Sequence, residues 1–328
     1  MPAPAERARA FAQHNAPWDA DPTLLPLLQA VLDDAALVAH GARLVLHYGG
    51  NGQYGGNGQL SLTSPSGLRA PWRAAVAAII DRETVVSQSG VVGAPVRGAD
   101  IRGVLLLYHL PSTELAAGDS LARACAVRVE MELSSAAMRL SSIAGTVDGL
   151  MHMLAAYDPD TARHSQAVRR LAHTFGQAAR LSSSQLLRLE WSAALHDVGK
   201  VSIPLAVLRK VGALTAPEWT LMRQHPTIGE RIVRPVPGLA AVALAIRHHH
   251  ERWDGAGYPD RLAGETIPLA SRLVNIIDAY ETMRAGRPYR APVCRGEAIR
   301  ELESGAGRQF DPALLDLLPA LHTCDIDF

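Results

Sequence analysis

Hydrophobic and polar positions follow a mixed pattern in the first part of the chain, from residue 21 to about residue 110. Apolar residues at helical spacing over 23–41 predict a helix. Alternating positions over 42–48 and 60–64 predict two strands, separated by the segment "GGNGQYGGNGQ". Because glycine and asparagine readily adopt the positive φ of tight turns, these strands are expected to form a hairpin.

Three further elements complete this part of the pattern. A helix is predicted over 72–80, a short strand over 83–88 and a buried strand over 100–110. Helices mixed with antiparallel strands are typical of a small α+β domain, placed here at 21–119 after an N-terminal tail at 1–20.

A long proline-free stretch follows at 120–157 and is predicted to be helical. At 1.5 Å per residue it reaches on the order of 50 Å, and Gly145 and Gly149 weaken it near its far end. Such a segment between two domains suits signal transmission or a parallel dimer. A last helix of one domain followed by the first helix of the next explains it equally well.

The pattern from 158 to 328 is helical throughout and predicts an all-α bundle. Asp158 before Pro159 is a typical helix start, with a capping carboxylate ahead of proline at the first helical position. Thr215 and Glu218 have the spacing of a capping box. No alternating strand pattern of useful length occurs in this part.

Composition limits the possible functions. Of 328 residues, 48% are hydrophobic and 20% charged, and 32 basic side chains balance 32 acidic ones. Zero net charge argues against binding to nucleic acid through bulk electrostatics, but it leaves open a small anionic ligand held by a few arginines.

The three cysteines, Cys125, Cys294 and Cys324, are an odd number without CxxC spacing, which favours reduced thiols. The N-terminus has no apolar core of signal-peptide length, and no apolar run is long enough to cross a bilayer. We therefore expect a cytoplasmic protein.

The 13 histidines are the most informative feature of the composition, and most of them lie after Leu150. His196 and Asp197 are adjacent in "ALHDVGK", a pair that alone indicates a buried structural contact. Imidazoles combined with carboxylates also suit Fe, Mn or Zn, in the kind of centre that activates water. Further potential ligands on the predicted helices favour this second interpretation: His164, His225, the run His248–His250, and Asp278.

Helical geometry separates the three consecutive histidines. Three and four residues beyond Ile246 lie His249 and His250, which continue an apolar stripe and are predicted to point inward. His248 lies on a different face and is predicted to be a neighbour rather than a ligand. The stripe consists of Leu239, Val242, Ala243 and Ile246.

Helical spacing also predicts where the side chains of Asp160 and Asp278 lie. Asp160 and His164 are four residues apart, so both can reach one metal, although a carboxylate in a first helical turn is equally explained by the helix dipole. Asp278 shares one side of its predicted helix with Ser271, Val274, Asn275 and Thr282.

The segment from about Asp158 to Leu318 resembles an HD-GYP domain, a branch of the HD superfamily of metal phosphohydrolases. The resemblance rests on "DPDTARHS", "ALHDVGKVSIP", "LTAPEWTLMRQHPTIG", "HHERWDGAGYPDRLAGETIPLASRLVNIIDAYETM", "RPYR" and "GRQFDP". It implies that Asp197 bridges two metals, Fe or Mn, and that Asp160 stands where some members bind a third. The implied dinuclear ligands are His164, His196, Asp197, His225, His249, His250 and Asp278.

The resemblance also implies a reaction and a set of substrate contacts. The family hydrolyses cyclic di-GMP to pGpG or GMP, so His196, Asp197 and Lys200 are expected to be catalytic. Lys200 matches a phosphate-contacting lysine. "RAGRPYR" has Gly286 where the family normally has an acidic residue. The remaining implied substrate contacts are Gly257, Tyr258, Pro259, Arg287 and Arg290.

The N-terminal part resembles a GAF domain, a sensory fold. The resemblance is carried by "VRGADIRGVLLLYHLPSTELAAGDSLARACAVRVEMEL", where a strand with glycine leads through an acidic turn into a long helix. It covers roughly the first 130 residues and implies regulation by this domain. Signalling-protein partners and a homodimer through the connecting helix are the expected assemblies.

Three alternatives remain at this stage. A non-catalytic cyclic di-GMP effector is disfavoured because every expected ligand is present. A phosphodiesterase of another cyclic dinucleotide stays open, since the "GYP" loop does not decide which bases are accepted. A helical enzyme that acts on mononucleotides or polyphosphate is disfavoured by the extended "HHERWDGAGYP" and "RPYR" matches.

Overall fold

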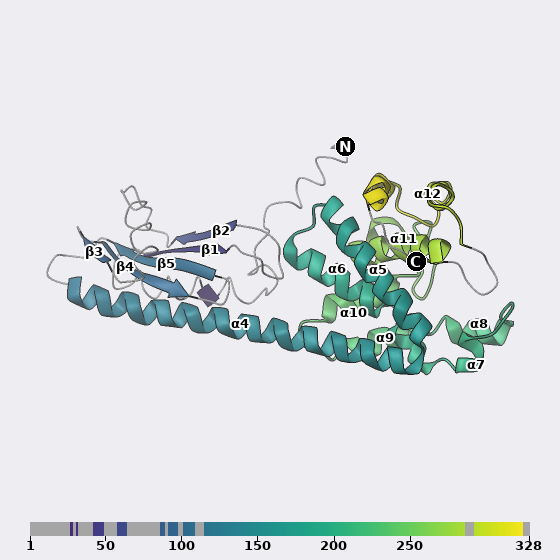
Figure 1. Cartoon of the computed structure of the whole chain (residues 1–328), viewed down its shortest axis with the longest axis horizontal. Helices are drawn as coiled ribbons and strands as arrows, with labels where there is room; N and C mark the ends of the chain where they lie inside the picture. Colours follow the sequence, from purple (N-terminus) through teal and green to yellow (C-terminus); the bar gives the residue numbers. More distant parts are fainter. Residues whose placement is uncertain are drawn as a thin grey trace. The chain divides into compact units, whose positions relative to one another are not determined.

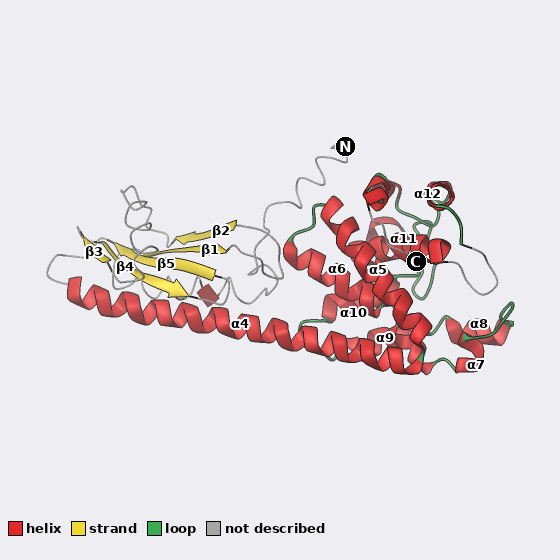
Figure 2. Cartoon of the chain, viewed as in Figure 1, coloured by secondary structure: helices red, strands yellow, loops and turns green. Residues whose placement is uncertain are grey.

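The computed structural model describes residues 27–28, 31, 42–48, 58–63, 86–88, 91–97, 101–108, 115–285 and 292–323. The chain forms two compact units, with the border inside one long helix between Ser141 and Ser142. One unit contains a β-sheet and the other a set of helices (Figures 1 and 2).

The sheet is antiparallel throughout, with the strand order β2-β1-β5-β4-β3. The predicted hairpin is confirmed, because β1 pairs with β2 and Tyr48 lies opposite Gly58 at the end of the ladder. The predicted buried strand is β5, in which Leu105, Leu106 and Leu107 are fully buried. The strands are β1 (Ala42–Tyr48), β2 (Gly58–Thr63), β3 (Val86–Gln88), β4 (Val91–Arg97) and β5 (Ile101–Tyr108).

Strand β4 was missed by the sequence analysis, because Gly93 and Pro95 interrupt its pattern. Pro95 lies opposite Val104 of β5, and the described residues of β3 pair with Val91, Val92 and Gly93.

Other N-terminal predictions lie largely outside the described residues. Of the helix expected over 23–41, only residues 27, 28 and 31 are described, and these are helical. The helix expected over 72–80 is not among the described residues.

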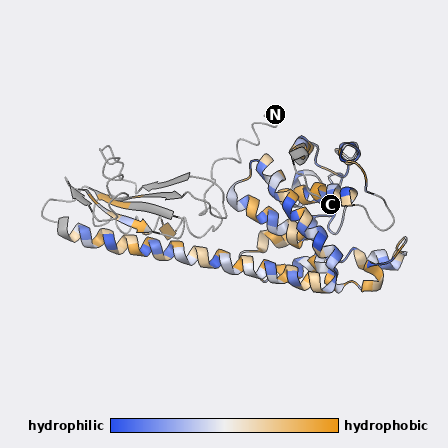
Figure 3. Ribbon diagram, viewed as in Figure 1, coloured by the Kyte–Doolittle hydropathy of each residue, from blue (hydrophilic) through white to orange (hydrophobic). Residues whose placement is uncertain are grey.

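Helix α4 (Leu115–Tyr157) confirms the predicted connecting helix and begins five residues earlier than expected. Gly145 and Gly149 do not interrupt it. Apolar and polar residues both occur along its whole length (Figure 3). Its buried side chains recur at helical spacing on one side: Ala122, Ala126, Val129, Leu133, Ala136, Val147 and Leu154.

The second unit confirms the predicted all-α bundle, since its described residues contain helices and only an isolated β-bridge. Asp158 caps α5 by accepting a hydrogen bond from Thr161 N, and Glu218 accepts one from Thr215 N, as the start signals predicted. The α-helices after α4 are α5 (Pro159–Ala178), α6 (Ser183–Leu195), α7 (Leu205–Leu208), α8 (Ala216–Met222), α9 (His225–Val233), α10 (Ala240–His248), α11 (Leu269–Ala285), α12 (Arg295–Ser304) and α13 (Pro312–Leu315). The 3-10 helices are η3 (Val198–Ser202), η4 (Gly264–Thr266) and η5 (Leu318–Thr323).

The core of this bundle lies where α5, α6, α11 and α12 meet. Phe175, Leu189, Ile277 and Leu302 are fully buried in one apolar cluster. This packing fixes α5 and α11, two helices that carry the chemistry described below. Among the described helices, none combines the length and the apolar character that a membrane span requires.

Replacing Phe175 with alanine is expected to lower the free energy of unfolding by about 3–5 kcal/mol, because it leaves a cavity in this cluster. Chemical denaturation measures the change. The matched substitution Val211→Ala, at a side chain that is 81% exposed, is expected to change stability by less than about 0.5 kcal/mol. Equal effects of the two substitutions would contradict the assigned core.

Candidate metal centre

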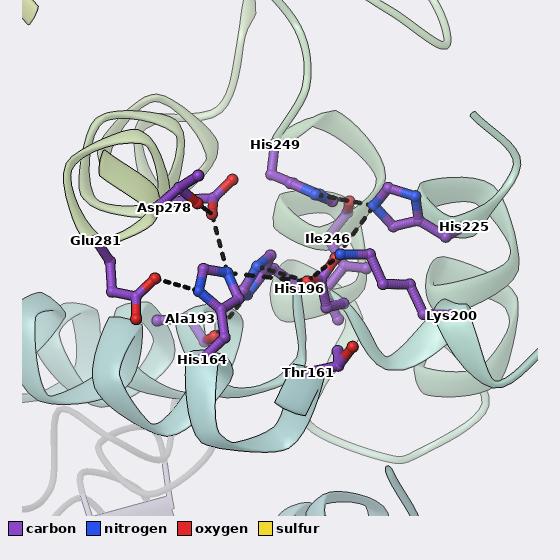
Figure 4. A network of polar contacts seen from close by, with 12 residues as sticks. Thr161, His164, Ala193, His196, Lys200, His225, Ile246, His249, Asp278 and Glu281 are labelled. Atoms are coloured by element: carbon purple, nitrogen blue, oxygen red, sulfur yellow. Dashed lines mark hydrogen bonds and ion pairs between the residues drawn. The ribbon is translucent and has the colours of Figure 1, made fainter. Parts of the chain in front are cut away.

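Helices of the second unit bring the predicted ligands together in two groups of three. Within each group, the candidate ligand atoms lie within 4.8 Å of one another. Figure 4 shows side chains of both groups, which converge from several helices. The first group consists of His164, His196 and Asp278, and the second consists of His225, His249 and His250.

Asp197 lies between the two groups and faces both. Its Oδ2 atom is 3.3 Å from His196 Nε2 and 3.9 Å from His164 Nε2. Its Oδ1 atom is 3.3 Å from His225 Nε2. The side chain is 2% exposed. One carboxylate therefore presents a separate oxygen to each group.

Three of the histidines are oriented by their own backbone. Nδ1 donates a hydrogen bond to the carbonyl three residues earlier: His196 to Ala193 at 2.8 Å, His225 to Met222 at 2.7 Å and His249 to Ile246 at 2.6 Å. A carbonyl only accepts, so Nδ1 carries the proton in each ring and a neutral ring has a lone pair at Nε2. Such anchoring of the second nitrogen is typical of metal-binding histidines.

The lone pairs then face one another and face carboxylate oxygens. His225 Nε2 lies 3.3 Å from His249 Nε2. His196 Nε2 is buried and has no hydrogen-bond partner among the described residues. Converging acceptors in a buried place are unfavourable unless a cation lies among them. The residues present thus fit divalent metal ions with imidazole and carboxylate ligands.

The charge states of the second group agree with this fit. Burial lowers the pKa of His225 to about 3 and that of His250 to about 4, and it holds the pKa of His249 well below its usual value. These three imidazoles are therefore neutral at pH 7. Although burial opposes it, the ammonium of Lys200 holds the pKa of Asp197 well below its usual range, so this carboxylate is ionised.

His164 is held differently, by two carboxylates on α11. Its Nε2 lies 2.9 Å from Asp278 Oδ1, and its Nδ1 is hydrogen-bonded to Glu281 (Figure 4). Against the effect of burial, these contacts raise the pKa of His164 to about 9. Glu281 was missed by the sequence analysis, although it lies one helical turn from Asp278. It is the partner that orients the ring of His164.

Glycine makes the close approach of two ligand-bearing segments possible. A Cβ on Gly199 would lie 2.0 Å from the carbonyl oxygen of His225, so any other residue would force η3 and α9 apart. This contact places Asp197 beside His225. A Cβ on Gly257 would lie 2.4 Å from the backbone nitrogen of Arg252, so the loop after the paired histidines folds back on its own start.

The loop is fastened through Asp260. Arg247 binds this carboxylate through two nitrogens, at 2.6 and 2.7 Å, and His248 Nε2 lies 2.9 Å from it. Glu251 accepts a hydrogen bond from Asp260 N at 2.7 Å. His248 is thus buried by its contact with the loop, outside both ligand groups. Arg247, Glu251 and Asp260 were not recognised from the sequence.

The loop holds Tyr258 against the metal centre. The ring of Tyr258 stacks on the ring of His250, with 4.9 Å between centroids and 28° between planes. Tyr258 N donates a hydrogen bond to His250 O at 3.3 Å. The peptide bond between Tyr258 and Pro259 is cis. Tyr258 therefore forms one wall of the centre.

The remaining predicted residues lie as follows. Lys200 Nζ is 2.6 Å from Asp197 Oδ2, at the edge of the centre. Asp160 belongs to neither ligand group; its side chain is 75% exposed and pairs with Arg163 in the first turn of α5. Arg287 and Arg290 lie outside the described residues.

The apolar stripe that precedes the three histidines is buried, as predicted. Leu239, Val242, Ala243 and Ile246 are fully buried, whereas Leu244 is 41% exposed. Helix α10 ends at His248, so His249 and His250 lie in the turn that follows.

The family model described as HD domain matches residues 148–314. The chain belongs to the HD domain family. This HD domain contains both ligand groups and the loop fastened by Asp260.

Curated relatives match about half of the chain. A cyclic di-GMP phosphodiesterase of Thermotoga maritima is 38% identical over 173 residues, which cover 51% of this chain and 46% of the relative. A 3'3'-cGAMP-specific phosphodiesterase of Vibrio cholerae is 39% identical, with 52% and 33% covered. A cyclic di-GMP phosphodiesterase response regulator of Xanthomonas campestris is 38% identical, with 47% and 42% covered. The matched part is thus less than half the length of each of these relatives.

Glu281→Gln is expected to weaken metal binding at the group that contains His164 by about 10- to 100-fold, because a neutral amide no longer holds Nδ1 as firmly. Calorimetric titration with Mn²⁺ then shows one weakened binding step and one unchanged step. Glu303→Gln, at an exposed glutamate of α12, serves as the matched control. Equal weakening of both steps would contradict two separately anchored groups.

Asp260→Ala is expected to loosen the loop, because Arg247 and His248 lose their shared carboxylate, whereas the bond from N of residue 260 to Glu251 remains. Amide hydrogen exchange should rise by about tenfold or more over 255–260 and stay unchanged in the middle of α10. The same control, Glu303→Gln, should leave both regions as they are. Unaltered exchange over 255–260 would show that this contact does not hold the loop.

Proposed function

We propose that the HD domain is of the HD-GYP type and hydrolyses a cyclic dinucleotide, cyclic di-GMP, to pGpG or GMP. The observation that carries the proposal is Asp197, whose two oxygens face two separate groups of ligands. Relatives that match about half of the chain are named for cyclic di-GMP and for 3'3'-cGAMP. These names support a phosphodiester substrate.

Two divalent metal ions are the proposed cofactors, with Fe or Mn as the preferred identities because imidazole and carboxylate ligands suit them. His164, His196 and Asp278 would hold one ion, His225, His249 and His250 the other, and Asp197 both. When bound, such ions lower the pKa of water and polarise phosphoryl oxygens. A third ion beside Asp160 stays a prediction.

The chain's own side chains have separate tasks in this proposal. Lys200 is 17% exposed and directed at Asp197, so its ammonium lies where it can offset charge on a phosphate oxygen. His196 and Asp197 hold the reacting centre in place. Arg287 and Arg290 are proposed to bind phosphate, since paired guanidinium groups suit that geometry.

The stacked pair of His250 and Tyr258 has a positioning task. The rings keep water and side chains away from one side of the ligands. Gly257 permits the fold of the loop, and Pro259 continues it. This wall is the proposed contact for the sugar and base of the bound nucleotide.

The proposal extends to the other unit. The antiparallel sheet with the order β2-β1-β5-β4-β3 is compatible with a GAF-type sensory domain that regulates hydrolysis. Helix α4 connects the sheet to the HD domain in sequence and is proposed to form a homodimer. Val127, Met131 and Met138, which are 54–73% exposed on this helix, are the proposed contacts. A cytoplasmic location and signalling-protein partners complete the proposal.

Asp197→Asn is expected to lose metal from both groups and to reduce hydrolysis of cyclic di-GMP by at least about 100-fold, since both groups depend on this carboxylate. Metal content and product formation are measured on the same samples, purified without chelator. Asp316→Asn, at an exposed aspartate after α13, is the matched control.

Two results would contradict the proposal. Full hydrolysis by Asp197→Asn with its metal retained would remove Asp197 from the mechanism. A metal-replete wild-type protein that binds cyclic di-GMP without turnover would favour an effector. Parallel assays with cyclic di-GMP and 3'3'-cGAMP decide which bases are accepted.

A further inference from the structure

We propose that Arg223, together with the hydroxyl of Tyr258, binds the second phosphodiester of the cyclic dinucleotide, the one that is not being cut. This inference rests on the proposed function, because it assumes a substrate with two phosphates. It assigns a binding site to a residue that the sequence analysis did not single out.

The first observation is the position of the Arg223 guanidinium. Its Cζ atom lies over the ring of Tyr258, 5.5 Å from the centroid. The ring of His250 stacks on the same Tyr258 ring, with 4.9 Å between centroids. Arg223 thus lies against the aromatic ring that contacts a candidate metal ligand.

The second observation is that the guanidinium of Arg223 has no ion-pair partner among the described residues. It is exposed at the end of α8, and no carboxylate lies within ion-pair distance of it among the described residues. Other basic residues nearby form ion pairs: Lys200 with Asp197, Arg247 with Asp260 and Glu230, and Arg252 with Asp254. The described part of the HD domain thus offers a free guanidinium beside the centre.

The site around Arg223 is built on fixed supports. Arg223 lies two residues before His225, whose ring is anchored to Met222 O. Tyr258 is held by the loop fastened through Asp260. Tyr258 Oη has no hydrogen-bond partner in the described structure, so it is available as a donor. The two donors thus belong to segments that are anchored separately.

The ligand chemistry follows from this arrangement. A guanidinium and a phenolic hydroxyl both donate to phosphate oxygens, and the planar fork of arginine suits a phosphodiester. The reacting phosphate must reach the ligand groups. A cyclic dinucleotide carries a second phosphate that remains outside, and Arg223 is placed to neutralise it.

A purely structural role for Arg223 makes a different prediction. A cation–π contact at an exposed site contributes little to stability. If packing on Tyr258 were its only role, removing the guanidinium would affect every substrate of the centre alike. A phosphate contact affects only substrates with two phosphates.

The experiment compares cyclic di-GMP with bis(p-nitrophenyl) phosphate, which has a single phosphodiester. For Arg223→Gln in the full, metal-loaded chain, KM for cyclic di-GMP is expected to rise about 10- to 100-fold while kcat changes less than about threefold. Hydrolysis of bis(p-nitrophenyl) phosphate should stay unchanged. Arg223→Lys should recover part of the affinity, and the matched control Arg231→Gln, on the exposed side of α9, should behave as wild type.

Equilibrium binding of cyclic di-GMP separates this inference from the proposed function. If wild type binds cyclic di-GMP without hydrolysing it, the proposed function fails, and a weaker affinity of Arg223→Gln still supports the phosphate contact. If wild type neither binds nor hydrolyses it, both proposals are overturned. If Arg223→Gln keeps wild-type affinity and KM, or loses activity on both substrates equally, only the inference is overturned.

Discussion

The carboxylate of Asp197, buried among histidine nitrogens, is the contact on which the second unit depends. An ionised group in such a place is tolerated only with compensating charge, which Lys200 supplies from one side. Segments remote in sequence must come together to surround it: α5, η3, α9, α11 and the turn after α10. The glycine at 199 and the apolar cluster around Phe175 serve this convergence.

Much of the arrangement could be predicted from the sequence, because each candidate ligand lies on a helix or in the turn that ends one. The stripe that ends in Ile246 predicted that His249 and His250 point inward, and both belong to a group whose ligand atoms converge, whereas His248 does not. Contacts between segments that are distant in sequence could not be predicted from the sequence. Glu281 reaches His164 across 117 positions of sequence, and Asp260 is joined to His248 by a fold of the loop. Periodicity indicates which way a side chain points, but not which distant partner it meets.

The fold shows the same difference between local patterns, which could be predicted, and contacts between segments, which could not. Long, regular patterns such as α4 and β5 were predicted well. Strand β4 was missed because a proline and a glycine are poor strand residues in isolation. Pairing with β5 along Val91–Arg97 keeps both residues in the strand. Local propensity thus failed where pairing with a neighbouring strand decided the outcome.

The bonds from Nδ1 to a carbonyl three residues earlier have a consequence for how the centre forms. Each of His196, His225 and His249 takes its orientation from a carbonyl in its own turn of chain and needs no distant segment for it. A bound metal therefore does not have to restrict the rotation of these three rings. Assembly then reduces to docking segments whose donor atoms already aim correctly, which keeps the entropic cost of closing the centre small.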